Sequence, residues 1–121
     1  MRLALVGSRN FIDYKSFKLA IFKTLQEWNK DISDIKCIIS GGAKGADTLA
    51  EQFAREFNIE TQIYRVDWKQ YGRGAGLMRN TTIVNDSTNM IAFPSKFGKG
   101  TQDSIRKAHI SCDKVKVLYI D

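Results

Sequence analysis

The sequence has little histidine, little cysteine and no long apolar run, and each scarcity excludes a class of function. Its 121 residues include one histidine, His109, which is far along the chain from the glycine-rich loops, so no Ser-His-Asp triad can be argued around it. We interpret it as a surface or C-cap residue near a helix end. No group of His, Cys and Asp residues has metal-ligand spacing, so we expect no metal site and no cofactor.

The apolar segments are short, which argues against a membrane protein. None approaches the ~20 residues that a membrane span needs, so we expect no membrane partner. The first of them, "RLALVG" at 2–7, is too short and too soon interrupted by Gly7 to be a signal peptide. Cys37 and Cys112 are far apart and form no C-x-x-C motif, so we expect reduced thiols in a cytoplasmic protein.

The sequence does have enough apolar residues for a core, together with an excess of positive charge. A chain of this length with 43% hydrophobic residues predicts one folded domain over residues 1–121. The formal net charge of +6 favours an anionic partner. A nucleotide, a nucleic acid and simple solubility would each account for that charge.

Strand-like and helix-like segments alternate along the whole chain, with no internal repeat, linker or low-complexity tract. Strands are predicted at 2–7, 37–40, 61–66, 89–94 and 114–120, and helices at 13–28, 47–57, 78–86 and 101–109. Thr101 is the expected N-cap of the last helix. This alternation predicts an α/β fold with a parallel five-stranded sheet and helices on both faces.

Glycine-rich loops follow three of the predicted strands: "GSRNF" at 7–11, "SGGAKGAD" at 40–47 and "PSKFGKGT" at 94–101. In parallel sheets, ligands bind beyond the carboxyl ends of the strands, where the strand order reverses. If the order is 3-2-1-4-5, the three loops converge on one crevice. The last two loops also open helices, whose N-terminal N–H groups and positive dipole ends attract anions.

Any one of these loops alone is typical of an ordinary turn. Together they carry the basic residues Arg9, Lys44, Lys96 and Lys99, which favours an anionic ligand.

The loop "PSKFGKGT" is not a P-loop. The motif G-x-x-x-x-G-K-[ST] would need a glycine at Phe93 and a serine or threonine at Gly100. We interpret the loop instead as one wall of a composite phosphate site.

A fourth stretch, "DWKQYGRGAGLMRN" at 67–80, is expected to be a long glycine-rich loop. Its length exceeds that of most connections in compact domains, which is typical of a functional lid. The basic residues Lys69, Arg73 and Arg79 lie in or beside this loop. Trp68 is expected to pack the loop against the body, whereas Tyr71 either packs or stacks on a base.

The segments "GSRNF", "SGGAKGADTLAEQFA", "DWKQYGRGAGLMRN" and "IAFPSKFGKGT" resemble, in order, the motifs of the SLOG superfamily. They are most similar to those of its small YspA-like branch, and the resemblance covers nearly the whole chain. Members of the superfamily include the cytokinin-activating LOG phosphoribohydrolases and the DNA-processing protein DprA. The resemblance implies a Rossmann-like fold, a site for a nucleotide or nucleotide-derived small molecule, and a homo-oligomer.

The LOG enzymes carry the motif P-G-G-x-G-T-x-x-E and an arginine from an upstream helix. Pro94 matches the proline, Thr101 matches the threonine, and either Gly98 or Gly100 matches the glycine before it. Arg79 resembles the family arginine.

The sequence differs from the LOG motif at the position where catalysis needs a charged side chain. Ser95 and Lys96 stand at the two glycines of the motif, and Ser104 stands at its glutamate. That carboxylate takes part in cleaving an N-glycosidic bond, where an oxocarbenium-like centre must be stabilised. A serine supplies no such charge. Asp103 is one helix position away, a rotation of about 100°, which makes it a weak catalytic candidate.

The candidate ligand-binding residues come from these loops and motifs. The fork of Arg9 suits a phosphate, although a surface salt bridge would explain it equally. Asp47 either accepts a ribose hydroxyl or caps its helix, and we favour the cap. The full set is Gly7, Ser8, Arg9, Ser40, Gly41, Gly42, Lys44, Gly45, Asp47, Arg79, Asn80, Pro94, Gly98, Lys99, Gly100 and Thr101.

Three functions remain open from the sequence. We favour the binding, sensing or sequestering of a nucleotide or nucleotide-derived small molecule over catalysis. The second is a nucleoside-phosphate N-glycosidase that uses Asp103 or a group of the substrate. The third is single-stranded nucleic acid binding, which the charge and the resemblance to DprA favour. The sparse aromatic residues and the lack of a basic run count against it.

Overall fold

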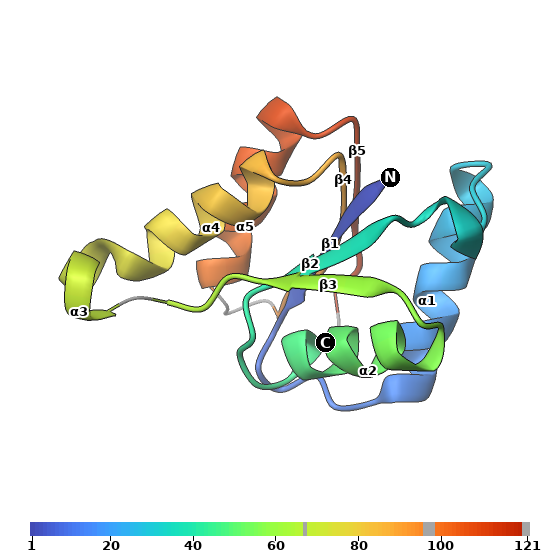
Figure 1. Cartoon of the computed structure of the whole chain (residues 1–121), viewed down its shortest axis with the longest axis horizontal. Coiled ribbons are helices and arrows are strands. Elements are labelled where there is room, and N and C mark those ends of the chain that lie inside the picture. Colours follow the sequence, from blue (N-terminus) through green and yellow to red (C-terminus); the bar gives the residue numbers. More distant parts are fainter. Residues whose placement is uncertain (67, 96–98, 120–121) are drawn as a thin grey trace.

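The computed structural model describes residues 1–66, 68–95 and 99–119, and within these ranges five strands form one parallel sheet (Figure 1). The strands are β1 (Arg2–Gly7), β2 (Cys37–Ser40), β3 (Glu60–Ile63), β4 (Asn89–Phe93) and β5 (Lys114–Val117). Their order is β3-β2-β1-β4-β5, and each neighbouring pair is parallel. The α/β fold class and the predicted strand order are therefore confirmed.

Helices connect the strands and cover both faces of the sheet. The helical segments are α1 (Tyr14–Glu27), the 3-10 turn η1 (Ile32–Asp34), α2 (Ala46–Glu56), α3 (Trp68–Tyr71), the 3-10 turn η2 (Gly72–Gly74), α4 (Ala75–Asn85) and α5 (Lys99–Ser111). Figure 1 shows α1 and α2 on one side of the strands, with α4 and α5 together on the other. Within the described ranges, no helix combines the length and apolar character that crossing a bilayer requires.

The alternation of side chains along β1 separates two cores. Leu3 and Leu5 pack with buried residues of α1 and α2, whereas Ala4 and Val6 pack with buried residues of α4 and α5. Successive residues of a strand point to opposite faces, so one central strand anchors both helical layers. Because β1 is also paired with β4 from Leu3 to Gly7, the loop that follows it starts from a fixed position.

The prediction of a long loop at 67–80 is wrong, because α3, η2 and α4 occupy most of that stretch. Glycines lower helix propensity, but α4 buries Ala75, Ile83 and Val84, and the two latter pack in the core shared with α5. Tertiary packing thus outweighs the local preference, and Arg79 and Asn80 are presented by a helix. The lid interpretation loses its basis.

Several boundaries also differ from the predicted ones, three of them near the cavity or at the end of a strand. Helix α5 begins at Lys99, so Thr101 lies inside its first turn and is not the N-cap. Strand β3 ends at Ile63, before the predicted end at residue 66, and β5 ends at Val117. Beyond β3, the Tyr64 hydroxyl donates to Asp86 at 2.8 Å, which directs the chain toward the end of α4.

Candidate functional site

The loop after β1 is held between β4 and α2. The Ser8 N–H donates to the Phe93 carbonyl at 2.9 Å, and the Ser8 carbonyl accepts from the Ala46 N–H at 3.1 Å. A Cβ at Gly7 would lie 2.7 Å from the Phe93 carbonyl oxygen and 2.8 Å from the Ala46 Cβ. Only glycine fits this approach, and it brings Ser8 and Arg9 to the carboxyl edge of the sheet.

The second glycine loop packs directly on the first. Gly45 has a φ of 76°, and a Cβ there would collide with the backbone of Ser8 and Arg9. It is the N-cap of α2 and makes no side-chain capping bond. Since the Ala46 N–H already bonds the Ser8 carbonyl, this helix end uses one of its N–H groups to join the two loops. The α2 N-terminus therefore has one N–H group fewer to offer to an anion than the sequence predicts.

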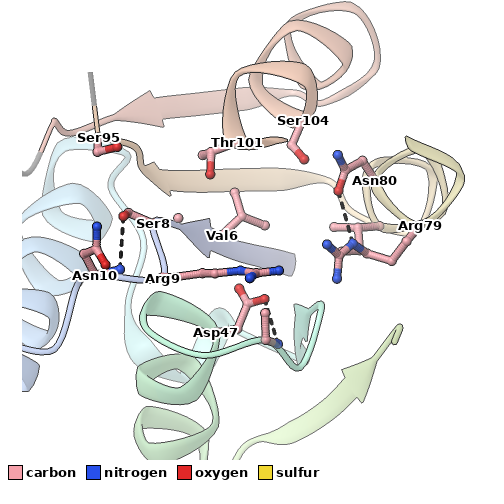
Figure 2. Close-up of a pocket in the computed structure, with 13 residues that line it drawn as sticks. Val6, Ser8, Arg9, Asn10, Asp47, Arg79, Asn80, Ser95, Thr101 and Ser104 are labelled. Atoms are coloured by element: carbon pink, nitrogen blue, oxygen red, sulfur yellow. Dashed lines mark hydrogen bonds between the residues drawn. The ribbon is translucent and has the colours of Figure 1, made fainter. Parts of the chain in front are cut away.

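A cavity of about 470 Å³ opens where these loops meet α4 and α5 (Figure 2). It lies beyond the carboxyl ends of β1 and β4, the point at which the strand order reverses. Its lining is Val6, Gly7, Ser8, Arg9, Asn10, Ala43, Asp47, Arg79, Asn80, Ile83, Ser95, Thr101 and Ser104.

The structure brings together only part of the predicted ligand-binding set. The predicted residues that line the cavity are Gly7, Ser8, Arg9, Asp47, Arg79, Asn80 and Thr101. The described residues that lie outside its lining are Ser40, Gly41, Gly42, Lys44, Gly45 and Pro94.

Several of these outer residues support the walls. The Gly41 carbonyl accepts from Arg79 Nη1 at 3.1 Å, and the Gly42 carbonyl accepts from Arg65 Nη1 at 2.9 Å. Pro94 is buried and Lys44 is exposed. Lys96 and Gly98 lie outside the described residues, as do the side chain of Lys99 and the surroundings of Gly100 at the start of α5.

The lining also includes residues that the sequence reasoning did not select as ligand contacts: Val6, Asn10, Ala43, Ile83, Ser95 and Ser104. Asn10, Ala43 and Ser95 belong to the three predicted glycine-rich loops, so their position in these loops could have indicated them. Val6 and Ile83 are strand and helix positions whose exposure to the cavity has no signature in the sequence.

Two arginines from distant elements face this cavity. Figure 2 shows the Arg9 side chain running between Val6 and Asp47, with its guanidinium directed toward Arg79 on α4. Burial lowers the pKa of Arg79, the Asp47 charge opposes that shift, and the Arg9 charge adds to it. An arginine remains protonated in proteins, so the two guanidinium groups create a locally positive cavity that favours an anion.

Asp47 is the one carboxylate among the described lining residues, and it does not cap its helix. It lies in the first turn of α2 and its Oδ2 accepts from the Ala43 N–H at 3.1 Å. Its side chain is buried, with 7% of the residue exposed. Burial raises its pKa, while the Ala43 N–H and the Arg79 charge oppose that rise. The favoured cap interpretation is wrong, because Gly45 holds that position and Asp47 ties the preceding loop to α2.

A hydrogen-bonded chain joins Arg79 to α5. Arg79 Nε donates to Asn80 Oδ1 at 3.1 Å, and Asn80 Nδ2 donates to Asp103 Oδ2 at 3.3 Å. Asp103 also pairs with Arg106 at 2.5 Å and Lys107 at 2.8 Å. Burial raises the pKa of Asp103, but the hydrogen bonds from Lys107 and Asn80 outweigh it and leave the pKa lowered.

The helical position of Asp103 separates it from the cavity. Ser104 lines the cavity and Asp103 does not, as a rotation of about 100° per residue requires. Figure 2 shows Thr101 and Ser104 directed from α5 toward Arg9 and Asn80. Asp103 instead fixes the amide of Asn80, so its observed contacts are those of a positioning residue.

The remaining candidates are not brought into the cavity. Lys69 and His109 are exposed on α3 and in the last turn of α5. The side chains of Trp68, Tyr71 and Arg73 lie outside the described residues. In the part of the chain that the structure describes, no three His, Cys, Asp or Glu side chains are grouped as metal ligands.

Known proteins match both the sequence and the fold of this chain. Residues 1–71 match the model of the YspA, cpYpsA-related SLOG family. The Gene 61 protein of Mycobacterium phage D29 is 34% identical over an alignment of 77 positions, and this alignment covers 59% of this chain and 62% of the phage protein. This chain therefore spans less than two thirds of that relative.

A solved structure of DNA processing protein A from Helicobacter pylori, described for its single-stranded DNA binding mode, aligns with a TM-score of 0.66 at 17% identity. The alignment covers 97% of this chain and 64% of that one, and at this identity it shows a shared fold. The family match extends over more than half of the sequence, from β1 through α3. The chain therefore belongs to the YspA, cpYpsA-related SLOG family.

Proposed function

We propose that this protein binds a nucleotide or nucleotide-derived small molecule, with a phosphate held between Arg9 and Arg79. The observation that carries the proposal is the convergence of these two guanidinium groups on one cavity at the switch point of the sheet. Arginine forks bind two phosphate oxygens at once. Open α/β sheets bind their ligands at this edge.

The other lining groups suit the rest of such a ligand. Hydroxyl groups from Ser8, Ser95, Thr101 and Ser104 surround the cavity, and each can donate to a phosphate oxygen or accept from a ribose hydroxyl. Asp47 is an acceptor in the same wall and suits a ribose hydroxyl better than a phosphate. The volume of about 470 Å³ is within the range of small-molecule sites.

The site favours binding or sensing over hydrolysis of an N-glycosidic bond. Such cleavage uses a carboxylate beside the reacting carbon. The residue of α5 that faces the cavity is Ser104, whereas Asp103 is engaged by Asn80, Arg106 and Lys107. Asp47 is held by the Ala43 N–H on the opposite wall.

Single-stranded nucleic acid is the second candidate. The structural relative from Helicobacter pylori is described as binding single-stranded DNA, and the net charge of +6 would favour it. The same arginine pair would then hold a backbone phosphate. A nucleic acid ligand also releases counterions along its length, so its affinity falls steeply with salt.

The proposal is tested by calorimetric titration with AMP, GMP, adenosine and a single-stranded oligonucleotide. We expect both monophosphates to bind with one defined stoichiometry, adenosine to bind at least about tenfold more weakly, and the oligonucleotide to lose its affinity at about 0.2 M salt. Tight, sequence-tolerant oligonucleotide binding that persists at about 0.2 M salt, with no response to the monophosphates, would support the nucleic acid function instead.

A further inference from the structure

A second cavity of about 430 Å³ adjoins the first on the α1 side of the β1–α1 loop. Its lining is Asn10, Phe11, Ile12, Asp13, Ser16, Ala20, Phe93, Leu118 and Tyr119. Among the described residues, Asn10 lines both cavities. Figure 2 shows Asn10 beside Ser8, at the end of the first cavity away from Arg79, so the residue that the two linings share lies at the end remote from the proposed phosphate position.

Aromatic and apolar side chains make up most of the lining of the second cavity, unlike that of the first. Phe11 is half-buried and its ring lies edge-on to Phe93 at 5.2 Å and to Phe17 at 5.9 Å between ring centroids. Phe17 and Phe93 belong to the buried core, so the partly exposed ring of Phe11 has a rigid backing. A planar apolar group packs well on such a surface.

Two large apolar side chains are left exposed at this cavity. Ile12 is 82% exposed and Tyr119 is 56% exposed, and they come from opposite ends of the chain, after β1 and after β5. Covering such surface gains free energy in proportion to the apolar area removed from water. Binding of a flat, apolar group between these walls would therefore be favoured, because it would remove Ile12 and Tyr119 from water.

The carboxylate of the second cavity disfavours a second phosphate. Asp13 lies in its lining, where the carboxylate accepts from the Ser16 N–H at 3.2 Å and the Ser16 hydroxyl at 2.7 Å. These bonds favour the ionised form. A carboxylate repels phosphate but accepts N–H groups, and an uncharged ring with amino or ring N–H groups is complementary to it.

We propose that the second cavity is a nucleobase subsite, occupied by the base of the same ligand whose phosphate lies between Arg9 and Arg79. This inference rests on the proposed function. Asn10, at the junction, is placed to bond the ribose that connects the two parts. The base stacks against Phe11 and is flanked by Ile12 and Tyr119, with its N–H groups toward Asp13.

The test compares AMP with ribose 5-phosphate, which keeps the phosphate and sugar but has no base. Both are titrated into the wild-type chain and into Ile12→Ser and Tyr119→Ala. Ile110→Ser is the matched control, because Ile110 is 84% exposed on α5 and lies in the lining of neither cavity. We expect AMP to bind wild type about tenfold or more tightly than ribose 5-phosphate, since stacking of one base contributes on that scale.

In Ile12→Ser and Tyr119→Ala the preference for AMP should fall at least about threefold, with ribose 5-phosphate and Ile110→Ser unchanged. Photo-crosslinking with 8-azidoadenosine 5′-phosphate should modify the peptide that contains Phe11 or the one that contains Tyr119. An unchanged preference in both variants, or an adduct elsewhere, overturns the subsite while leaving the phosphate proposal intact. Loss of self-association by these variants without a change in preference also overturns it, and would assign the surface to a second copy of the chain.

Discussion

The two edges of the sheet each carry a cavity, and we assign the proposed ligand site to the smaller one. The cavity at the carboxyl edge measures about 470 Å³ and holds Arg9 and Arg79. The cavity at the amino edge measures about 580 Å³ and is lined by Ile32, Ser33, Ile35, Lys36, Phe57, Asn58, Ile59 and Glu60. Its charged residues are one of each sign, Lys36 and Glu60, whereas the cavity at the carboxyl edge has two arginines against one carboxylate, Asp47. Convergence of like charge, and not volume, distinguishes the two.

Both edges contain residues with a positive φ, but the residue types differ. At the amino edge, Asn29 and Asn58 follow α1 and α2 with φ values of 56° and 53°, a conformation that asparagine tolerates. At the carboxyl edge, Gly45 has φ 76° and ψ −127°, outside the left-handed helical region, and the Ser8–Arg9 backbone lies against it. Glycine is needed there because two loops must touch.

The largest expected effect is on stability, and it comes from placing asparagine, the residue with positive φ at the amino edge, at the position of Gly45. Gly45→Asn adds a side chain that strains the backbone and meets Ser8 and Arg9, so we expect the free energy of unfolding to fall by about 3 kcal/mol. Urea denaturation measures it. The matched change Asn58→Gly should cost less than about 1 kcal/mol. Similar losses in the two variants would contradict the distinction between the edges.

The next effect is on affinity. Arg9→Ala and Arg79→Ala should each weaken AMP binding by about 1.5–3 kcal/mol, because each removes a charge-assisted bond to phosphate. Arg55→Ala is the matched control, since it removes the same charge from an exposed position in the last turn of α2. Calorimetry measures the dissociation constants.

Stability separates the two arginine variants. Arg9 is exposed, and the melting temperature of Arg9→Ala should hardly change. Arg79→Ala also loses the bond to the Gly41 carbonyl and should cost about 1 kcal/mol. An unchanged dissociation constant in both variants would mean that the phosphate lies elsewhere.

A smaller effect is expected from Asp103→Asn, which removes the charge that pairs with Arg106 and Lys107 at the α5 end of the chain to Arg79. We expect a loss of about 1 kcal/mol in stability at neutral pH. The pKa of Asp103 is lowered in the folded protein, so its stabilisation is present above the ordinary aspartate pKa of about 3.9 and is lost as the pH falls toward the lowered value. Denaturation curves of wild type and variant should therefore converge in acid. A difference that persists there would exclude an electrostatic origin.

The smallest expected effect is on catalysis. Incubation of the wild-type chain with AMP or GMP should release no free base, as measured by chromatography, because the cavity wall of α5 presents Ser104. Multiple turnovers that Asp103→Asn abolishes would contradict this expectation. They would make Asp103 the catalytic carboxylate despite its contacts with Asn80 and Lys107.

The position of the cavity followed from the sequence because two simple rules agreed. Apolar segments ended by glycine predicted the strands, and parallel strands bring the loops at 7–11, 40–47 and 94–101 to one edge. The structure confirms the strand order and places Ser8, Ala43 and Ser95, one residue from each loop, in a single lining. Local patterns were sufficient because each loop directly follows a strand.

Other features depend on contacts between distant residues, and no local pattern predicts them. Helix α4 begins directly after Gly74 and contains Gly76, and it is stabilised because Ile83 and Val84 are buried in the core shared with α5. The chain from Arg79 through Asn80 to Asp103 joins residues that are 23 positions apart at its second bond. The proposed role of Asn10 depends on a second cavity whose lining includes Leu118 and Tyr119, more than 100 residues further along the chain.

The most direct test of the account uses amide and arginine side-chain NMR signals during a titration with AMP. We predict that the shifts concentrate on the backbone from Gly7 to Asn10 and on the Nε–H groups of Arg9 and Arg79. The signals of Ser33, Lys36 and Asn58 at the amino edge should stay in place. Shifts centred on the amino edge, or spread over surface lysines without saturation, would contradict the claim that the arginine pair at the carboxyl edge binds the phosphate.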